Sequence, residues 1–143
     1  MEIFIRQIST GDASAITVLT QQLGYPMSIE QIQINVNAVM NSENDDAFVA
    51  VLDNKVIGWI GVALSVQIEL LAYCVIRGLV VDDNYRNLGV GKLLIEKAKQ
   101  WGKEKENDKL RLRCNVIRTE THLFYQHLGF TETKQQKVFE INI

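Results

Sequence analysis

The sequence predicts an α/β fold in a single domain covering residues 1–143. Segments with the two-residue period of strands alternate along the chain with segments of helical period. The length of 143 residues suits one compact domain, and 47% hydrophobic with 22% charged residues is an ordinary globular composition. We find no linker, internal repeat or low-complexity segment, so we expect one core.

The N-terminal part predicts one strand followed by two helices. Apolar and polar residues alternate over Glu2–Ile8, as in a short strand. Capping residues then introduce a helix that stops at Gly24. Ser28, with Gln31 three residues later, forms the sequence pattern of a capping box and predicts the start of a second helix.

Three strands are predicted next. Ala47–Leu52 and Lys55–Val66 flank the dipeptide Asp53-Asn54, which favours a tight hairpin turn. Leu70–Val81 is the third strand. Its internal Gly78 indicates a bulge or the close approach of another group, because glycine weakens an ordinary strand.

The C-terminal part predicts a helix, a strand, a second helix and final strands. Helical spacing of apolar residues begins at Gly89 and ends near Gly102–Lys105. A strand over Leu110–Cys114 and a helix over Thr119–Leu128 follow. The remainder, Phe130–Ile143, reads as one or two further strands.

Charge and cysteine usage narrow the possible partners. A net charge of −2 gives no electrostatic reason to expect nucleic acid or an anionic membrane as a partner. Cys74 and Cys114 lack the spacing of a zinc site and suggest reduced core thiols, and we expect no metal. Met1–Ser9 does not resemble a signal peptide, and the apolar runs are too short to span a bilayer, so we expect a cytoplasmic protein.

The most informative segment is a glycine loop between a strand and a helix. It reads Arg86-Asn87-Leu88-Gly89-Val90-Gly91-Lys92. Unpaired N–H groups at a helix N-terminus attract anions, and glycine allows a phosphate to come close. A P-loop would need Gly in place of Arg86, and a dinucleotide-binding fingerprint would need a small residue in place of Leu94.

At these residues the chain resembles the GNAT acyl-CoA N-acyltransferases, whose pyrophosphate loop reads Q/R-x-x-G-x-G/A after a central strand. Arg118–Phe130, with Phe124-Tyr125 and then Gly129-Phe130, resembles a second signature of that family. The predicted element order also matches over nearly the whole chain. The resemblance implies a central mixed, mostly antiparallel sheet of about six to seven strands, flanked by about four helices and splayed where CoA binds.

The resemblance also implies roles for individual residues, with acetyl-CoA as the co-substrate. Arg86–Lys92 would hold the pyrophosphate, and Leu79, Val80 and Val81 would present their backbone to the pantetheine arm. An N–H at a bulge near Gly78-Leu79 would polarise the thioester carbonyl. Tyr125 matches the tyrosine that protonates the leaving thiolate, and Asn115 stands where a polar side chain contacts pantetheine.

The proton acceptor is less clearly defined by the sequence. Attack on the thioester requires a neutral amine, so a proton must be removed from the acceptor. Many relatives use a Glu on the central strand, but Val75 aligns with that position. Glu69 is our first choice because it is a carboxylate near the start of that strand, and Tyr73 and His122 are the alternatives.

The acceptor is predicted to be a small-molecule amine. The alternatives are a protein or peptide amine, and a CoA-binding sensor that has lost turnover. Tyr25 and Pro26 lie in one expected acceptor wall, residues 23–28, and residues 133–137 form another. Acidic residues at Glu43, Asp45 and Asp46 would favour a cationic acceptor unless they form only a solvated loop. The family resemblance also makes a homodimer possible.

Overall fold

The computed structural model describes residues 2–143. The chain divides into two compact units, a larger one that ends at Arg113 and a smaller one over Cys114–Ile143. The larger unit holds the sheet and the glycine loop, whereas the smaller one holds the second sequence signature. Each unit is described separately below.

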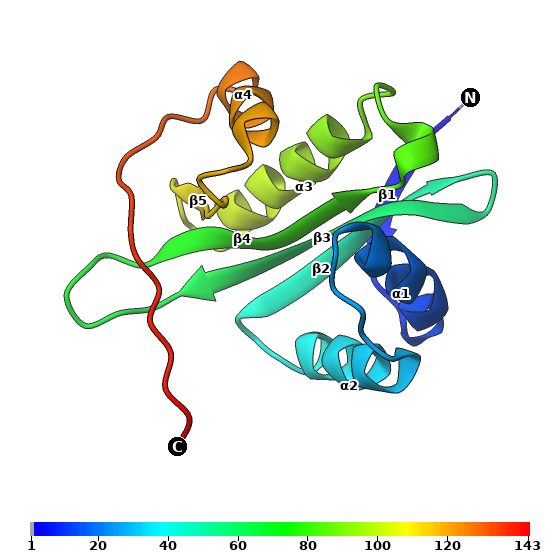
Figure 1. Ribbon diagram of the computed structural model, residues 1–143, viewed down its shortest axis with the longest axis horizontal. Coiled ribbons are helices and arrows are strands. Elements are labelled where there is room, and N and C mark those ends of the chain that lie inside the picture. The colour runs from blue at the N-terminus through cyan, green and yellow to red at the C-terminus, as the bar shows by residue number, and fades with distance from the viewer. Residues whose placement is uncertain (1) are drawn as a thin grey trace. The chain divides into compact units, whose positions relative to one another are not determined.

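The larger unit is built on a five-stranded sheet (Figure 1). Its strands, in their order across the sheet, are β1 (Phe4–Gln7), β2 (Asp45–Leu52), β3 (Lys55–Ser65), β4 (Tyr73–Val81) and β5 (Leu110–Leu112). The first four pair antiparallel in sequence order, and β5 pairs parallel to β4. The mixed, mostly antiparallel sheet is therefore confirmed, but it has five strands, fewer than the six to seven expected.

Helices flank this sheet on both faces, as Figure 1 shows for the larger unit. The helical segments are η1 (Thr10–Asp12), α1 (Ala13–Gln22), α2 (Ile29–Met40), η2 (Asp83–Tyr85), α3 (Val90–Glu104) and, in the smaller unit, α4 (Thr119–His127). Ser28 caps α2 by accepting a hydrogen bond from the Gln31 N–H at 3.1 Å. The Gln31 side chain donates to Asn35, so only half of the predicted capping box forms.

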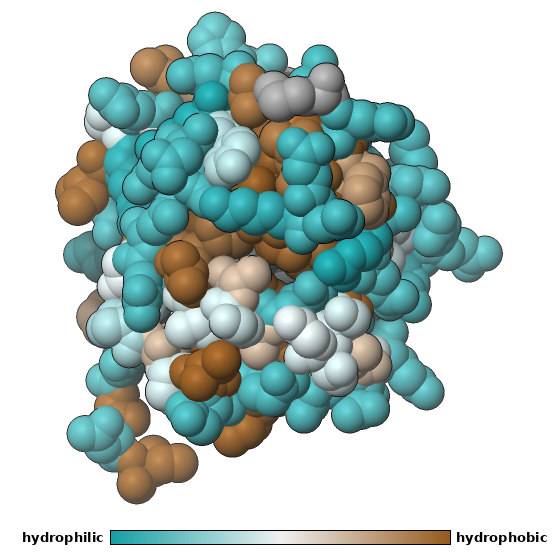
Figure 2. All heavy atoms as spheres, turned by 90° about the vertical axis from the view of Figure 1, so that its right-hand side faces the viewer, coloured by the Kyte–Doolittle hydropathy of each residue, from teal (hydrophilic) through white to brown (hydrophobic). Residues whose placement is uncertain are grey.

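The hydrophobic core lies on both sides of the sheet. On one side α1 packs on β3 and α2 on β2, with Ile16, Val36 and Val49 in one buried cluster. On the other side α3 buries Leu94, Ile95 and Ala98, each at most 1% exposed. In Figure 2 hydrophilic side chains cover most of the face shown, and hydrophobic ones form separate patches.

A partly buried ion pair holds the start of the first helical segment. Arg6 donates two hydrogen bonds of 2.8 Å to the Asp12 carboxylate, which also accepts from the Ser9 N–H at 2.8 Å. The hydrogen bonds from Arg6 lower the pKa of Asp12. This carboxylate therefore stays charged near neutral pH and joins β1 to η1.

The hairpin turn and the bulge predicted from sequence are both present. Asp53 and Asn54 have φ of 50° and 63°, as a two-residue turn between β2 and β3 requires. Along β3, Gly61 pairs with Gly78 but Val62 pairs with Ile76, which leaves Arg77 as the extra residue of β4. The bulge thus lies immediately before the predicted Gly78-Leu79 position.

Several predicted strand bounds differ from the structure, and one predicted strand is absent from the described residues 2–143. β4 begins at Tyr73 and not at Leu70, because residues 66–72 form an exposed loop without a facing strand. In the smaller unit, no strand forms over the predicted Phe130–Ile143. A strand exists only with a partner, and this segment has none among residues 2–143, although its pattern is apolar and alternating.

Candidate active site

The glycine loop ends in a helix N-terminus that no side chain caps. Gly89, the N-cap of α3, has φ of 79°, and no side chain there accepts from the first turn. The Leu93 N–H donates to the Gly89 carbonyl at 3.1 Å. Within α3, the N–H groups of residues 90–92 therefore have no carbonyl one turn earlier to bind. This arrangement suits an anion such as a phosphate.

The residues before Gly89 form a turn stabilised by a buried carboxylate. Asp82 is 6% exposed and accepts from the Asn84 N–H at 3.0 Å. Arg86 forms an ion pair with Asp83 at 2.6 Å, and both side chains are more than half exposed. Because an exposed pair of this kind contributes little stability, the Arg86 guanidinium is free to turn to a bound anion.

The outer edge of β4 is unpaired next to this loop. The parallel ladder with β5 ends where Ile76 meets Leu112, while β4 continues to Val81. Within the described residues 2–143, residues 77–81 consequently have a strand partner only on the β3 side, where Gly58–Gly61 face them. The Leu79–Val81 backbone is thus an open strand edge that leads directly into η2 and the glycine loop.

Gly58 allows the open edge and the helix N-terminus to come close together. A Cβ at residue 58 would lie 2.9 Å from the Val80 carbonyl oxygen and 3.2 Å from Val90 Cγ1. Both neighbours belong to the predicted CoA site. Sequence reasoning missed Gly58, although a glycine inside a strand is the signal for such a close approach.

Replacing Gly58 with alanine is expected to weaken acetyl-CoA binding and to lower the free energy of unfolding by about 1–3 kcal/mol. The added methyl group would push the first turn of α3 away from β4. Gly11→Ala is the matched control, because a Cβ there would meet nothing within 4 Å. Urea unfolding and calorimetric titration would test this, and equal values for both variants would contradict it.

A tryptophan packs against the bulge. A Cβ at Gly78 would lie 2.6 Å from the nearest atom of the Trp59 ring, so the ring fills the space beside the glycine. The Trp59 Nε1–H is buried and has no hydrogen-bond partner within residues 2–143. Gly78 stands out in the sequence, but its neighbour across the sheet does not.

In the smaller unit, Tyr125 lies on α4 within an aromatic group. Its ring meets Phe124 and Phe130 edge-on, at centroid distances of 5.2 and 5.6 Å. Burial, with a smaller contribution from nearby Cys114, raises the pKa of Tyr125 to about 12. The phenol is therefore protonated at neutral pH and is able to donate a proton.

Asn115 shapes the turn before α4. Its side-chain oxygen accepts from the Ile117 N–H at 3.1 Å, and its carbonyl accepts from the Arg118 N–H at 3.0 Å. The same carbonyl lies 2.8 Å from His122 Nε2. An N–H on Nε2 satisfies that contact and leaves Nδ1 as the free ring nitrogen of His122.

The other two candidate proton acceptors belong to the larger unit. Glu69 is exposed in the β3–β4 loop, four residues before β4 begins at Tyr73. Tyr73 is buried and accepts from Gln67 Nε2 at 3.1 Å. A hydrogen bond with Ser65, together with the Arg111 guanidinium near its ring, lowers the pKa of Tyr73.

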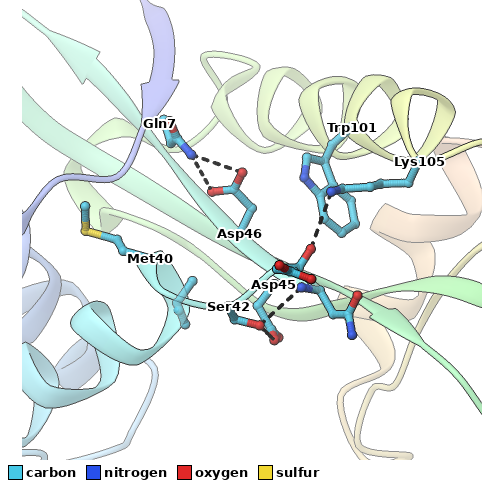
Figure 3. A pocket seen from close by; sticks show the side chains of 10 residues that line it. Gln7, Met40, Ser42, Asp45, Asp46, Trp101 and Lys105 are labelled. Carbon is cyan, nitrogen blue, oxygen red and sulfur yellow. Dashed lines mark hydrogen bonds between the residues drawn. The ribbon is translucent and has the colours of Figure 1, made fainter.

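A cavity of about 490 Å³ lies near the C-terminal end of α3, beside Trp101 and Lys105 (Figure 3). Two of its acidic side chains already have partners: Asp45 accepts from Ser42 at 2.7 Å, and Asp46 accepts from Gln7 at 3.1 Å. The glycine loop precedes the opposite end of α3. This cavity is therefore a site distinct from the open edge of β4.

The structure brings the predicted CoA residues together in two groups. The open edge at residues 79–81 and the loop at residues 86–92 adjoin within the larger unit, and Asn115 and Tyr125 lie in the smaller one. No helix within residues 2–143 is long and apolar enough to cross a membrane. In the same range, no three His, Cys, Asp or Glu side chains are placed to hold a metal ion.

Comparison with known proteins identifies the family. Residues 17–130 match the acetyltransferase (GNAT) family. This match covers most of the chain, including the glycine loop and α4. The chain belongs to this family of acetyltransferases. It is 29% identical over 133 residues to an uncharacterized N-acetyltransferase of Chlorobaculum tepidum, a match that covers 92% of this chain and 77% of that protein.

Solved structures share the fold. Aminoglycoside N-acetyltransferase AAC(6')-Iy in complex with CoA superposes with a TM-score of 0.89 at 20% identity, covering 99% of this chain and 96% of that one. An aminoglycoside acetyltransferase from an uncultured soil metagenomic sample, in complex with sisomicin, superposes with a TM-score of 0.77 at 21% identity. This match covers 99% of this chain and 96% of that one. These likenesses confirm the predicted α/β GNAT fold.

Proposed function

We propose that this GNAT acetyltransferase moves an acetyl group from acetyl-CoA directly to the primary amine of a small molecule. The observation that carries the proposal is the uncapped N-terminus of α3 at Gly89, adjoining the unpaired edge of β4. Both features lie inside the segment that matches the family.

The donor fits the residues of the larger unit. The N–H groups of residues 90–92, with Arg86 and Lys92, would hold the pyrophosphate, because they combine unpaired donors with positive charge. The open edge at residues 79–81 would hydrogen-bond the pantetheine arm as an added strand. When bound, acetyl-CoA supplies an acetyl group already activated as a thioester.

Two groups of the chain would then act on the reacting atoms, and a third would contact the pantetheine arm. As the amine nitrogen bonds to the carbonyl carbon, an N–H of the bulge at residues 77–79 would stabilise the developing oxyanion. As the C–S bond breaks, the Tyr125 hydroxyl would protonate the sulfur. The Asn115 amide, whose NH₂ makes no hydrogen bond within residues 2–143, would contact pantetheine.

The amine proton needs an acceptor. Glu69 remains the proposed base, since its exposed loop position allows it to act through water. Tyr73 is the alternative, supported by its lowered pKa and its position on β4. His122, with Nδ1 free, is the third candidate.

A small-molecule acceptor is supported by the solved structures that share the fold. The two compared above are aminoglycoside acetyltransferases, and one of them was solved in complex with sisomicin. A protein amine remains the second acceptor class, and binding of acetyl-CoA without turnover would indicate a sensor.

A thiol-release assay with acetyl-CoA tests the proposal across aminoglycosides, polyamines, amino acids and peptides. We expect saturable release with at least one small amine and none without an acceptor. Release only with peptides would reassign the acceptor, and calorimetric binding of acetyl-CoA without release would identify a sensor. If acetyl-CoA does not bind, the proposal fails.

A further inference from the structure

An arginine of β4 stands at the bulge where the acetyl group would react. Arg77 is the extra residue of that bulge, and the N–H groups of residues 77–79 include the proposed oxyanion donor. The Arg77 side chain is 62% exposed. A charged group of the acceptor that binds Arg77 would therefore lie beside the thioester carbonyl.

Arg77 lies on the face of the sheet opposite α3. On β4, Cys74 faces α3, because a Cβ at Gly102 of that helix would lie 3.4 Å from the Cys74 sulfur. On β3, Gly58 also faces α3, so Gly61, three residues along the strand, faces the opposite side. A Cβ at Gly61 would lie 3.8 Å from Arg77 Cβ, which places Arg77 on that opposite side as well. An acceptor can approach the bulge from there without meeting α3.

A carboxylate lies across β3 from this arginine. Asp45 on β2 pairs with Ala63, and Ala63 pairs with Val75, so the three form one row on the same face. Asp45, which also borders the cavity in Figure 3, has Oδ1 at 4.0 Å from Arg77 Nε, too far for a hydrogen bond. Its Oδ2 accepts from Ser42 at 2.7 Å. Within residues 2–143, the Arg77 guanidinium and Asp45 Oδ1 make no hydrogen bond, so both are available to a ligand.

We infer that the acceptor is a free α-amino acid whose carboxylate binds Arg77 and whose amino group lies beside Asp45. The inference rests on the proposed function and names its substrate class. An amino acid carries opposite charges on neighbouring groups, which complement the opposite charges of Arg77 and Asp45. The planar guanidinium matches a carboxylate with two parallel hydrogen bonds. Because an exposed ion pair contributes little stability, a ligand displaces it at low cost.

A second cation on the same face disfavours a polycationic acceptor. Arg111 on β5 pairs in register with Val75, the neighbour of Cys74, and so lies on the face opposite α3. Its guanidinium lies 4.3 Å from the centre of the Tyr73 ring, and the residue is exposed. The two guanidinium groups outweigh the single carboxylate of Asp45. They would repel an aminoglycoside, which carries several ammonium groups and no carboxylate, and attract the carboxylate of an amino acid.

The transfer step keeps the chemistry proposed above. The neutral amino nitrogen bonds to the acetyl carbon and the C–S bond breaks. One amine proton passes to the base and the sulfur gains a proton, so the products are an N-acetylamino acid and CoA. Arg77 would hold the carboxylate before and during this step, and its loss should therefore raise KM more than it lowers kcat.

Matched acceptors test the role of the carboxylate. Thiol release from acetyl-CoA is compared for the common amino acids and their carboxamides, which keep the amine but lack the negative charge. For at least one amino acid we expect a kcat/KM roughly 10–100-fold above that of its amide, as for hydrogen bonds to a charged group. Arg77→Gln should remove this preference by raising KM for the acid alone. Release with polyamines or aminoglycosides but with no amino acid would overturn the inference and leave the proposed function intact, whereas no release with any amine would contradict both.

A charge-swapped pair separates recognition from folding. Arg77→Asp with Asp45→Arg keeps the attraction across β3, so we expect the Tm of the natural chain but a Kd for the amino acid that is roughly 10–100-fold higher. Calorimetric titration of that amino acid into protein saturated with CoA measures this Kd without turnover. The matched control is Lys99→Gln, which removes a cation from the ion pair with Glu96 on α3 and should bind the amino acid normally. Equal affinity in the swapped and natural chains would show that this pair does not recognise the acceptor.

Discussion

Tyr125→Phe is expected to lower kcat by about 10²–10³-fold while leaving the affinity for acetyl-CoA unchanged. The hydroxyl is the group proposed to protonate the departing sulfur, and phenylalanine keeps the ring that packs between Phe124 and Phe130. Loss of the proton donor should therefore affect the chemical step and not binding. Steady-state kinetics with calorimetric titration would separate the two.

The pH dependence gives a second readout of the same residue. Because the pKa of Tyr125 is raised to about 12, its hydroxyl stays protonated through the whole alkaline range in which enzymes are assayed. Below about pH 11, any fractional loss of activity with rising pH should therefore be the same in the natural chain and in Tyr125→Phe. The matched control is His127→Gln, at the exposed end of the same helix. An unchanged kcat in Tyr125→Phe would remove this tyrosine from the mechanism.

Gly89→Glu is expected to weaken acetyl-CoA binding by more than about 100-fold. At φ of 79° any Cβ strains the backbone, and a carboxylate at the N-terminus of α3 would repel the pyrophosphate. Gly89→Asn should retain much more affinity, because asparagine tolerates this conformation better and carries no charge. Calorimetric titration of acetyl-CoA measures both effects.

A matched charge control is Gln100→Glu, on an exposed position of the same helix far from the loop. It should bind acetyl-CoA as the natural chain does, with unchanged thermal stability. If Gly89→Glu also binds normally, the anion site lies elsewhere and the assignment of the loop at residues 86–92 is wrong.

Local chemistry explains what the sequence could predict. Ser28 caps α2 through a contact only three residues away, and the turn at Asp53-Asn54 depends on those two residues alone. Gly78 indicated the bulge because a glycine inside a strand needs a reason. The glycine loop was recognisable because Gly89 and Gly91 stand at the start of a helix that closely follows a strand.

Features set by distant neighbours could not be predicted. The alternation at residues 139–143 resembles that of a true strand, but pairing depends on an edge elsewhere in space. Leu70 and Leu71 look like the start of β4, yet both are exposed because no strand faces them. Gly58 matters through Val80 and Val90, whose closeness to it appears only in three dimensions.

The contact between Trp59 and Gly78 gives the protein a natural optical probe. The chain has two tryptophans, and the other, Trp101, lines the cavity near the C-terminal end of α3. Indole emission shifts with the polarity and hydrogen bonding around the ring. A Trp101→Phe chain would therefore emit from Trp59 alone, and its spectrum would follow changes at the bulge during a titration without any added label.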